Sequence, residues 1–220
     1  MILHFRGSDY RISSSLASYS RMNNLMMALG FTESKENPNL CFKVEGGRPV
    51  LLLLYAVDLL LIGEEKLIKD EKRKLVLEFE MKELGMMHYF LSMEVWQSAD
   101  GVFLGQGKYT VEILKRFGMM DCKAIATPMA SNLKLLCDAS SESVDATIYR
   151  QMIGSLMYLM NTRPDICFAV NTLSQFLMDP RQVHLVATKH ILRYLKGIVD
   201  YGLRYDANQK VNLQGYVDSY

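Results

Sequence analysis

The most apolar segment of the chain, residues 50–62, is the feature that most limits its fold. A helix that spans a membrane needs about 20 apolar residues, and Asp58 inside this segment would cost roughly 2.5–3.5 kcal/mol at the centre of a bilayer. We therefore expect no contact with a membrane. Glycines before and after the segment favour two short buried strands that meet at a turn near Tyr55 to Asp58. The leucine-rich composition suits a buried helix equally well, and periodicity does not separate the two.

The composition is typical of a globular chain. Of its 220 residues 50% are hydrophobic, and 25 Lys and Arg against 24 Asp and Glu leave a net charge of +1. A disordered chain would be less apolar or more strongly charged, and a simple basic nucleic-acid binder would carry a larger excess of positive charge. Four scattered cysteines lack the short spacings of a zinc site, which predicts free thiols in a reducing, intracellular compartment, either cytoplasmic or nuclear. These cysteines are Cys41, Cys122, Cys137 and Cys167.

Patterns of both strand and helix follow one another along the chain, which predicts an α+β fold. Strands are expected over residues 40–45, 88–97, 102–104 and 202–205, and helices over residues 19–29, 64–81, 109–117, 149–160, 166–177 and 187–198. Asp100-Gly101 gives the strongest hairpin signal in the chain. Tyr89, Phe90 and Trp96 lie in an alternating strand, where aromatic side chains are more often part of a core than platforms for bases.

The last of these helices carries a basic side. At about 100° per residue, Lys189, Arg193 and Lys196 lie opposite an apolar stripe. Residues 181–204 contain five Lys or Arg and one Asp, a local charge of +4. This side predicts contacts with the phosphates of an RNA–DNA or DNA duplex, and an ordinary solvated helix side explains it equally well. His184 and His190 do not share a helical face, which favours structural histidines over metal ligands.

A series of ordered motifs runs through nearly everything after about Ser18. It includes Asn37-Pro-Asn-Leu, Tyr55-Ala-Val-Asp58, Leu84-Gly-Met-Met-His-Tyr-Phe-Leu91, Arg116-Phe-Gly-Met119, Thr127-Pro-Met129, Gly154-Ser-Leu-Met-Tyr-Leu159, Thr162-Arg-Pro-Asp-Ile166 and Leu192-Arg-Tyr-Leu-Lys-Gly197. This series closely resembles the reverse transcriptase of copia-type LTR retrotransposons. So many blocks in order are far more specific than a single short motif.

The resemblance implies part of an RNA-directed DNA polymerase. Residues 1–95 would form a partial palm of antiparallel strands and helices, residues 96–145 a thumb-like hairpin, helix and linker, and residues 146–210 a helical connection. Residues 211–220 would be the stub of the first strand of an RNase H domain. Asp218 matches the first metal-ligand position of such a domain, but one carboxylate of the several needed makes no nuclease.

Residues Tyr55 to Asp58 stand where the family has its Tyr-Val-Asp-Asp box, which supplies two carboxylates for Mg²⁺ or Mn²⁺. Here Val57 replaces the first Asp, and Asp58 alone remains as a catalytic and metal-binding remnant. We favour a turn residue without an ion over a metal ligand, because divalent ions need several hard oxygen ligands. The family's other catalytic Asp belongs to an earlier palm block that this sequence does not contain, and the surroundings of Asp9 do not match it.

Two further departures concern nucleic-acid contacts. Residues 13–18 replace the family's template-contact block, and Ser92 stands where the strand that contacts the primer usually has Gly. We therefore predict a truncated reverse transcriptase that is inactive as an isolated chain. The alternatives are a non-catalytic module that binds nucleic acid or protein, and a decaying translated fragment without a selected role. Missing palm strands would also leave apolar surface uncovered, which predicts self-association through the exposed palm surface.

Overall fold

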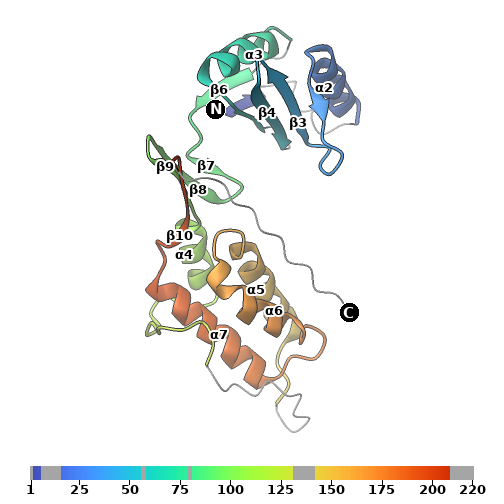
Figure 1. Cartoon of the computed structure of the whole chain (residues 1–220). Coiled ribbons are helices and arrows are strands. Elements are labelled where there is room, and N and C mark those ends of the chain that lie inside the picture. Colours follow the sequence, from blue (N-terminus) through green and yellow to red (C-terminus); the bar gives the residue numbers. More distant parts are fainter. Residues whose placement is uncertain (1, 6–15, 56–57, 79–80, 131–141, 209–220) are drawn as a thin grey trace, which may run out of the picture. The chain divides into compact units, whose positions relative to one another are not determined.

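The computed structural model describes residues 2–5, 16–55, 58–78, 81–130 and 142–208. The chain divides into two compact units, Met1–Met87 and His88–Tyr220 (Figure 1). Each unit contains an antiparallel sheet together with helices, so the predicted α+β class is confirmed. Among the described residues no helix has both the length and the apolar character that crossing a membrane requires.

The first unit is built on a six-stranded antiparallel sheet with the order β2-β3-β4-β5-β1-β6. Its strands are β1 (Ile2–Phe5), β2 (Thr32–Glu33), β3 (Leu40–Glu45), β4 (Arg48–Tyr55), β5 (Asp58–Ile62) and β6 (Met81–Gly85), and its helices are α2 (Leu16–Ala28) and α3 (Glu65–Glu78). The apolar segment 50–62 thus forms most of β4 and all of β5, paired from Leu51↔Ile62 to Tyr55↔Asp58. The two-strand interpretation is confirmed, and the buried-helix alternative is wrong.

Alternation along the central strands separates the two faces of this sheet. Val50 and Leu52 of β4, with Leu59 and Leu61 of β5, are buried in one core. The same core includes Met26 of α2 and Leu75 of α3, so both helices cover one face of the sheet. On the other face Leu60 of β5 is also buried, but Phe42 of β3 and Ile62 of β5 are exposed and Leu51 and Leu53 of β4 are half-buried, so this face is apolar and partly accessible.

A buried carboxylate joins the sheet to α3. Glu71 is 1% exposed, and its Oε1 accepts hydrogen bonds from Lys43 Nζ of β3 at 3.0 Å and from Lys74 Nζ at 2.8 Å. Two ammonium groups compensate one carboxylate whose charge would otherwise be costly to bury. The helix expected over residues 64–81 therefore also carries a structural ion pair with the sheet. The predicted C-terminal end at Met81 was wrong, because Met81 begins β6.

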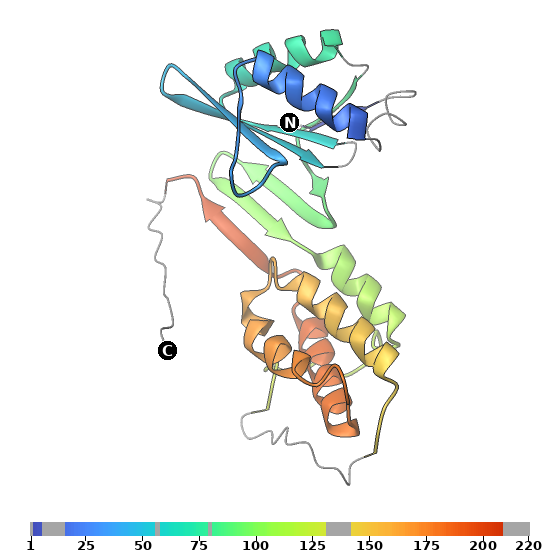
Figure 2. The ribbon, with the colours of Figure 1, turned by 90° about the vertical axis from the view of Figure 1, so that its right-hand side faces the viewer.

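The second unit combines a four-stranded antiparallel sheet, in the order β10-β9-β8-β7, with four α-helices among its described residues (Figure 2). Its elements are β7 (Tyr89–Phe90), β8 (Met93–Ser98), β9 (Gly101–Gly105), α4 (Gly107–Arg116), α5 (Ala146–Leu159), the 3₁₀ turn η1 (Pro164–Ile166), α6 (Cys167–Ser174), α7 (Gln182–Gly197) and β10 (Gly202–Asp206). The Asp100-Gly101 hairpin prediction is confirmed by the pairing of Ser98 with Gly101.

One predicted strand proved to be two. Residues 88–97 were expected to form a single strand, but Phe90 pairs with Met93 across a two-residue turn. Leu91 and Ser92 in that turn have φ values of 49° and 56°. Two successive positive φ values are the signature of a type I′ turn, whose backbone twist suits a tight hairpin. Leucine and serine rarely adopt this conformation, which explains why the sequence did not signal the turn.

The helices of the second unit share one core. It contains residues of α5, α6 and α7, represented by Ile153, Val170 and Ile191, all fully buried. Helix α5 begins at an N-cap aspartate, Asp145, whose carboxylate accepts from the backbone N–H groups of residues 147 and 148. The Tyr149 hydroxyl donates to the carbonyl oxygen of Leu173 at 2.8 Å, which ties α5 to α6. This satisfied polar contact lets a large aromatic ring lie in the core.

Candidate functional site

The hairpin predicted to carry the polymerase chemistry is formed by β4 and β5. Tyr55 ends β4 and is 49% exposed, and Asp58 begins β5 directly opposite it. Ala56 and Val57 lie outside the described residues. Strand β5 is flanked by β4 and β1, and the backbone of Asp58 is paired with that of His4 in β1.

The chemistry of this hairpin does not fit an intact two-metal site. Two-metal nucleotidyl transfer holds two divalent ions about 3.5–4 Å apart, each with several oxygen ligands. Val57 supplies no ligand, and neither β1 nor β4, the two strands beside β5, contains an aspartate or glutamate. Within the described ranges, no three histidine, cysteine, aspartate or glutamate residues are placed to hold a metal ion. Asp218 lies outside the described residues, so its predicted role stays a prediction.

The predicted basic residues lie on α7 in the second unit. Lys189 is exposed, while Arg193 and Lys196 are half-buried. Arg193 Nε donates to the carbonyl oxygen of Lys123 at 2.9 Å, and His190 Nε2 lies 3.0 Å from the carbonyl oxygen of Thr127. The segment after α4 therefore lies against this helix and brings Lys123 next to the predicted basic side.

The histidines on and near α7 have structural partners. His184 is fully buried, accepts a hydrogen bond from the Arg181 backbone N–H at Nδ1 and stacks on Phe176 with ring centroids 3.9 Å apart. His190 contacts a backbone carbonyl, as described above. These contacts agree with the expectation that both histidines serve the fold.

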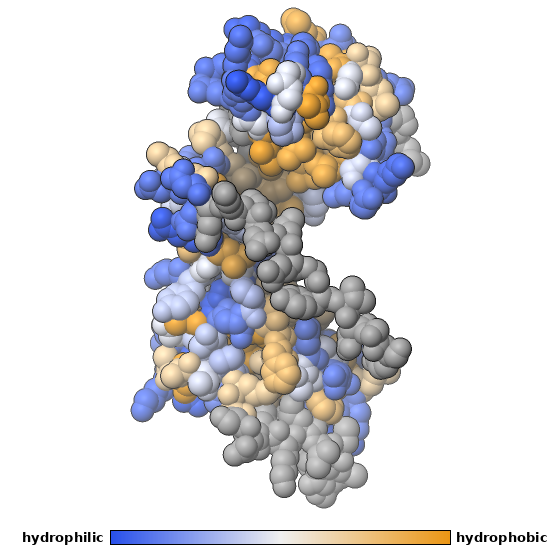
Figure 3. Space-filling model, in the orientation of Figure 1, coloured by the Kyte–Doolittle hydropathy of each residue, from blue (hydrophilic) through white to orange (hydrophobic). Residues whose placement is uncertain are grey.

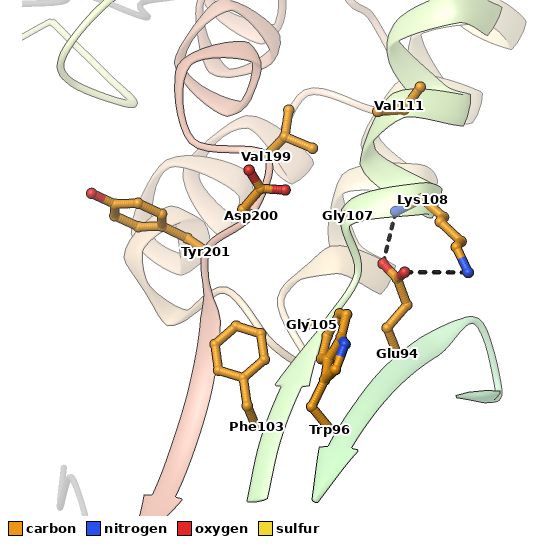
Figure 4. A pocket seen from close by; sticks show the side chains of 10 residues that line it. All are labelled: Glu94, Trp96, Phe103, Gly105, Gly107, Lys108, Val111, Val199, Asp200 and Tyr201. Atoms are coloured by element: carbon orange, nitrogen blue, oxygen red, sulfur yellow. Dashed lines mark hydrogen bonds and ion pairs between the residues drawn. The ribbon is translucent and has the colours of Figure 1, made fainter. Parts of the chain in front are cut away.

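A pocket in the second unit was not predicted. Its volume is about 710 Å³, and it lies between the sheet, the start of α4 and the segment that joins α7 to β10 (Figure 4). The residues that line it are Glu94, Trp96, Phe103, Gly105, Gly107, Lys108, Val111, Val199, Asp200 and Tyr201. Trp96 is 51% exposed, so the expectation that this side chain belongs to a core was wrong.

Strand register creates this pocket. Trp96 of β8 pairs with Phe103 of β9, and their ring centroids lie 5.3 Å apart with a tilt of 54°. On the next strand Gly202 pairs with Gly105, so no side chain fills the space beside the rings. A Cβ atom at Gly105 would lie 3.1 Å from the Phe103 ring and 3.2 Å from the Trp96 ring. In the sequence, the glycines at 105, 107 and 202 are the visible signs of this open space.

Comparison with known proteins identifies the family to which this chain belongs. Residues 11–131, more than half of the chain, match the family described as reverse transcriptase (RNA-dependent DNA polymerase). The chain therefore belongs to the reverse transcriptase family. Its relatives among transposon Pol polyproteins confirm the predicted copia-type reverse transcriptase.

Three relatives illustrate the similarity. A retrovirus-related Pol polyprotein from transposon RE2 of Arabidopsis thaliana is 36% identical over 92% of this chain, and that from transposon TNT 1-94 of Nicotiana tabacum is 34% identical over 91%. The chain spans only 14% and 16% of these two polyproteins. A mitochondrial protein of Arabidopsis thaliana, described as uncharacterised, is 40% identical over 76% of this chain and 70% of its own length. No solved structure matches the chain.

Proposed function

We propose that this chain is a reverse transcriptase fragment that does not polymerise DNA by itself. The observation that carries the proposal is the donor set of the β4–β5 hairpin, where Asp58 is the one carboxylate and the neighbouring strands β1 and β4 bring no other. In this family Mg²⁺ or Mn²⁺ would activate the primer hydroxyl and stabilise the leaving pyrophosphate. A single carboxylate leaves most of the charge of two divalent ions uncompensated.

Primer extension on a homopolymer RNA template, in Mg²⁺ and separately in Mn²⁺, tests this proposal. We expect no incorporation above that of a heat-denatured sample. The matched variant is Asp58→Asn, which removes the remaining carboxylate and should leave this background unchanged. Robust incorporation by the unaltered chain, lost in Asp58→Asn, would show that the hairpin still catalyses the reaction.

We propose as a second function that α7 contributes to binding an RNA–DNA or DNA duplex. The supporting observation is the shared face of Lys189, Arg193 and Lys196, with Lys123 held next to it by the bond from Arg193. Lysine and arginine contacts to phosphates release counterions, so the affinity should fall with salt, with a slope of about −0.9 per phosphate contact. Because Arg193 also has a structural bond, the test leaves this residue in place.

Fluorescence anisotropy with a labelled RNA–DNA duplex, titrated at several salt concentrations, measures this slope. Lys189→Glu/Lys196→Glu should reduce its magnitude by about 1–2. The control, Lys35→Glu/Lys66→Glu, changes the net charge equally at two exposed residues of the other unit. Equal effects of the two pairs would show a general charge effect, and salt-independent binding would contradict the proposal. If neither binding nor polymerisation is found, the alternative of a decaying fragment is favoured.

We also propose that the first unit self-associates through its uncovered sheet face. Leu51 lies between Phe42 of β3 and Ile62 of β5 in the strand register. Phe42 is 38% exposed and Ile62 48%. Apolar surface on this unit is visible in Figure 3, and contiguous apolar patches of this kind commonly mark interaction sites.

Sedimentation velocity over a range of concentrations tests the self-association. Ile62→Lys should shift the distribution toward the monomer, because it places a charge at an exposed position of the apolar face. The control Val186→Lys introduces the same charge at an exposed residue of α7. A monomer at all concentrations for the unaltered chain would refute this proposal.

A further inference from the structure

The pocket beside β8 and β9 has a charge that no other group in it balances. Glu94 is 8% exposed, and its Oε2 accepts from the backbone N–H of Lys108 at 2.9 Å, while Oε1 lies 3.5 Å from Lys108 Nζ. One carboxylate and one ammonium thus form a pair. Asp200 lines the same pocket, and within the described part of the chain its carboxylate has no ion pair or hydrogen bond. The pocket therefore carries a net charge of about −1.

The remaining surface of the pocket is largely apolar. The rings of Trp96 and Phe103 form one side, and Val111 and Val199 lie on the opposite side, toward α4 and α7 (Figure 4). Because Gly105 has no side chain, backbone atoms alone lie beside the rings. Aromatic faces attract cations through the negative charge of the π-system, and planar guanidinium groups stack on them.

We propose that this pocket binds a planar organic cation of the amidinium or guanidinium type that carries an apolar body. The cation would lie against Trp96 with its charge near Asp200, and its apolar body would fill the space between the rings and the two valines. The volume of about 710 Å³ is in the range of pockets that hold drug-sized molecules. Two carboxylates and one ammonium disfavour an anion, including a nucleotide with its phosphates. This inference does not depend on duplex binding or on the state of the β4–β5 hairpin.

Trp96 makes the test direct, because it is the only tryptophan of the chain and lines the pocket. Three probes of nearly equal shape, benzamidine, benzamide and benzoate, differ chiefly in charge. We expect benzamidine to change the tryptophan emission with a dissociation constant of roughly 1 mM, as its size allows. Benzamide and benzoate should bind at least about fivefold more weakly. Equal effects of benzamidine and benzamide would overturn the proposal, and so would an emission that benzamidine leaves unchanged.

Two variants test whether the carboxylate of Asp200 attracts the cation. Asp200→Asn should weaken benzamidine binding about fivefold and should remove most of the preference over benzamide. Asp121→Asn, at an exposed aspartate of the same unit that does not line the pocket, should change neither quantity. A fivefold loss in both variants, or in neither, would contradict the role of Asp200. N-acetylarginine methylamide distinguishes two sources of such a cation. If the pocket binds an arginine of a polypeptide, this compound should bind more tightly than benzamidine. If the pocket binds a free small molecule, the peptide backbone is not required and benzamidine should bind at least as tightly.

Discussion

Replacing Ser92 with glycine should stabilise the second unit. Ser92 has a φ of 56° in the two-residue turn between β7 and β8. A non-glycine residue held at such a φ costs about 1–2 kcal/mol, which glycine avoids. Glycine also gains conformational freedom in the unfolded chain, which offsets about 0.5–1 kcal/mol of that relief. The expected net gain is about 0.5–1 kcal/mol, which in a unit of about 130 residues raises the melting temperature by about 2–4 °C.

Thermal unfolding followed by the fluorescence of Trp96 measures this shift, because the only tryptophan lies in β8 of the same unit. The control is Ser98→Gly, at the end of β8, where φ is not positive. Its hydroxyl donates to the Gly101 carbonyl and accepts from the Asp100 N–H, so this change should lower the melting temperature. An unchanged or lower melting temperature in Ser92→Gly would refute the argument that the turn at Ser92 is strained.

Three further perturbations test the packing of the two units. Lys43→Met should destabilise the first unit by about 1–3 kcal/mol in urea unfolding, because Glu71 keeps only one of its two ammonium partners; a change below about 0.5 kcal/mol would contradict a structural ion pair. Gly202→Ala should cost about 3 kcal/mol by tryptophan-monitored unfolding, because its Cβ atom would lie 2.1 Å from the carbonyl oxygen of Leu104; a neutral effect would show that β10 moves freely. Burial raises the pKa of Tyr149 to about 12, above its unfolded value near 10. The contribution of this side chain to the free energy of unfolding is therefore fully present below pH 10 and is lost as the pH rises from about 10 to 12. Tyr149→Phe should remove that part of the pH dependence of unfolding, and identical pH profiles of stability for the two proteins would contradict this role of burial.

The sequence predicted those parts of the fold that local patterns determine. The glycines around residues 50–62 and the length of that segment fitted the β4–β5 hairpin, although its composition left a buried helix open, and Asp100-Gly101 predicted the β8–β9 hairpin. Helical patterns predicted the helices α4, α5, α6 and α7 of the second unit. The β7–β8 turn could not be predicted, because Leu91 and Ser92 are poor residues for positive φ and their conformation is determined by the surrounding sheet.

The candidate sites were predictable only where neighbours in the sequence also meet in space. Lys189, Arg193 and Lys196 share a face because they lie on one helix. The pocket depends instead on the pairing of Gly202 with Gly105, which joins residues almost a hundred positions apart. No local pattern specifies that register, so Trp96 was expected in a core and Asp200 was not recognised as a binding residue.

The β4–β5 hairpin shows why a chain of this family can lose catalytic groups without losing its fold. The side chains that hold the hairpin in place, such as Leu52, Leu59 and Leu61, belong to the core under α2 and α3. The ligand positions of the family correspond to residues 57 and 58, and Asp58 lies at the end of the strand pairing, opposite Tyr55. Two adjacent carboxylates at the tip would also repel each other in the absence of metal ions. Replacing one of them by valine would therefore remove a repulsion without changing any of these core leucines, so a stable fold does not require that both carboxylates are kept.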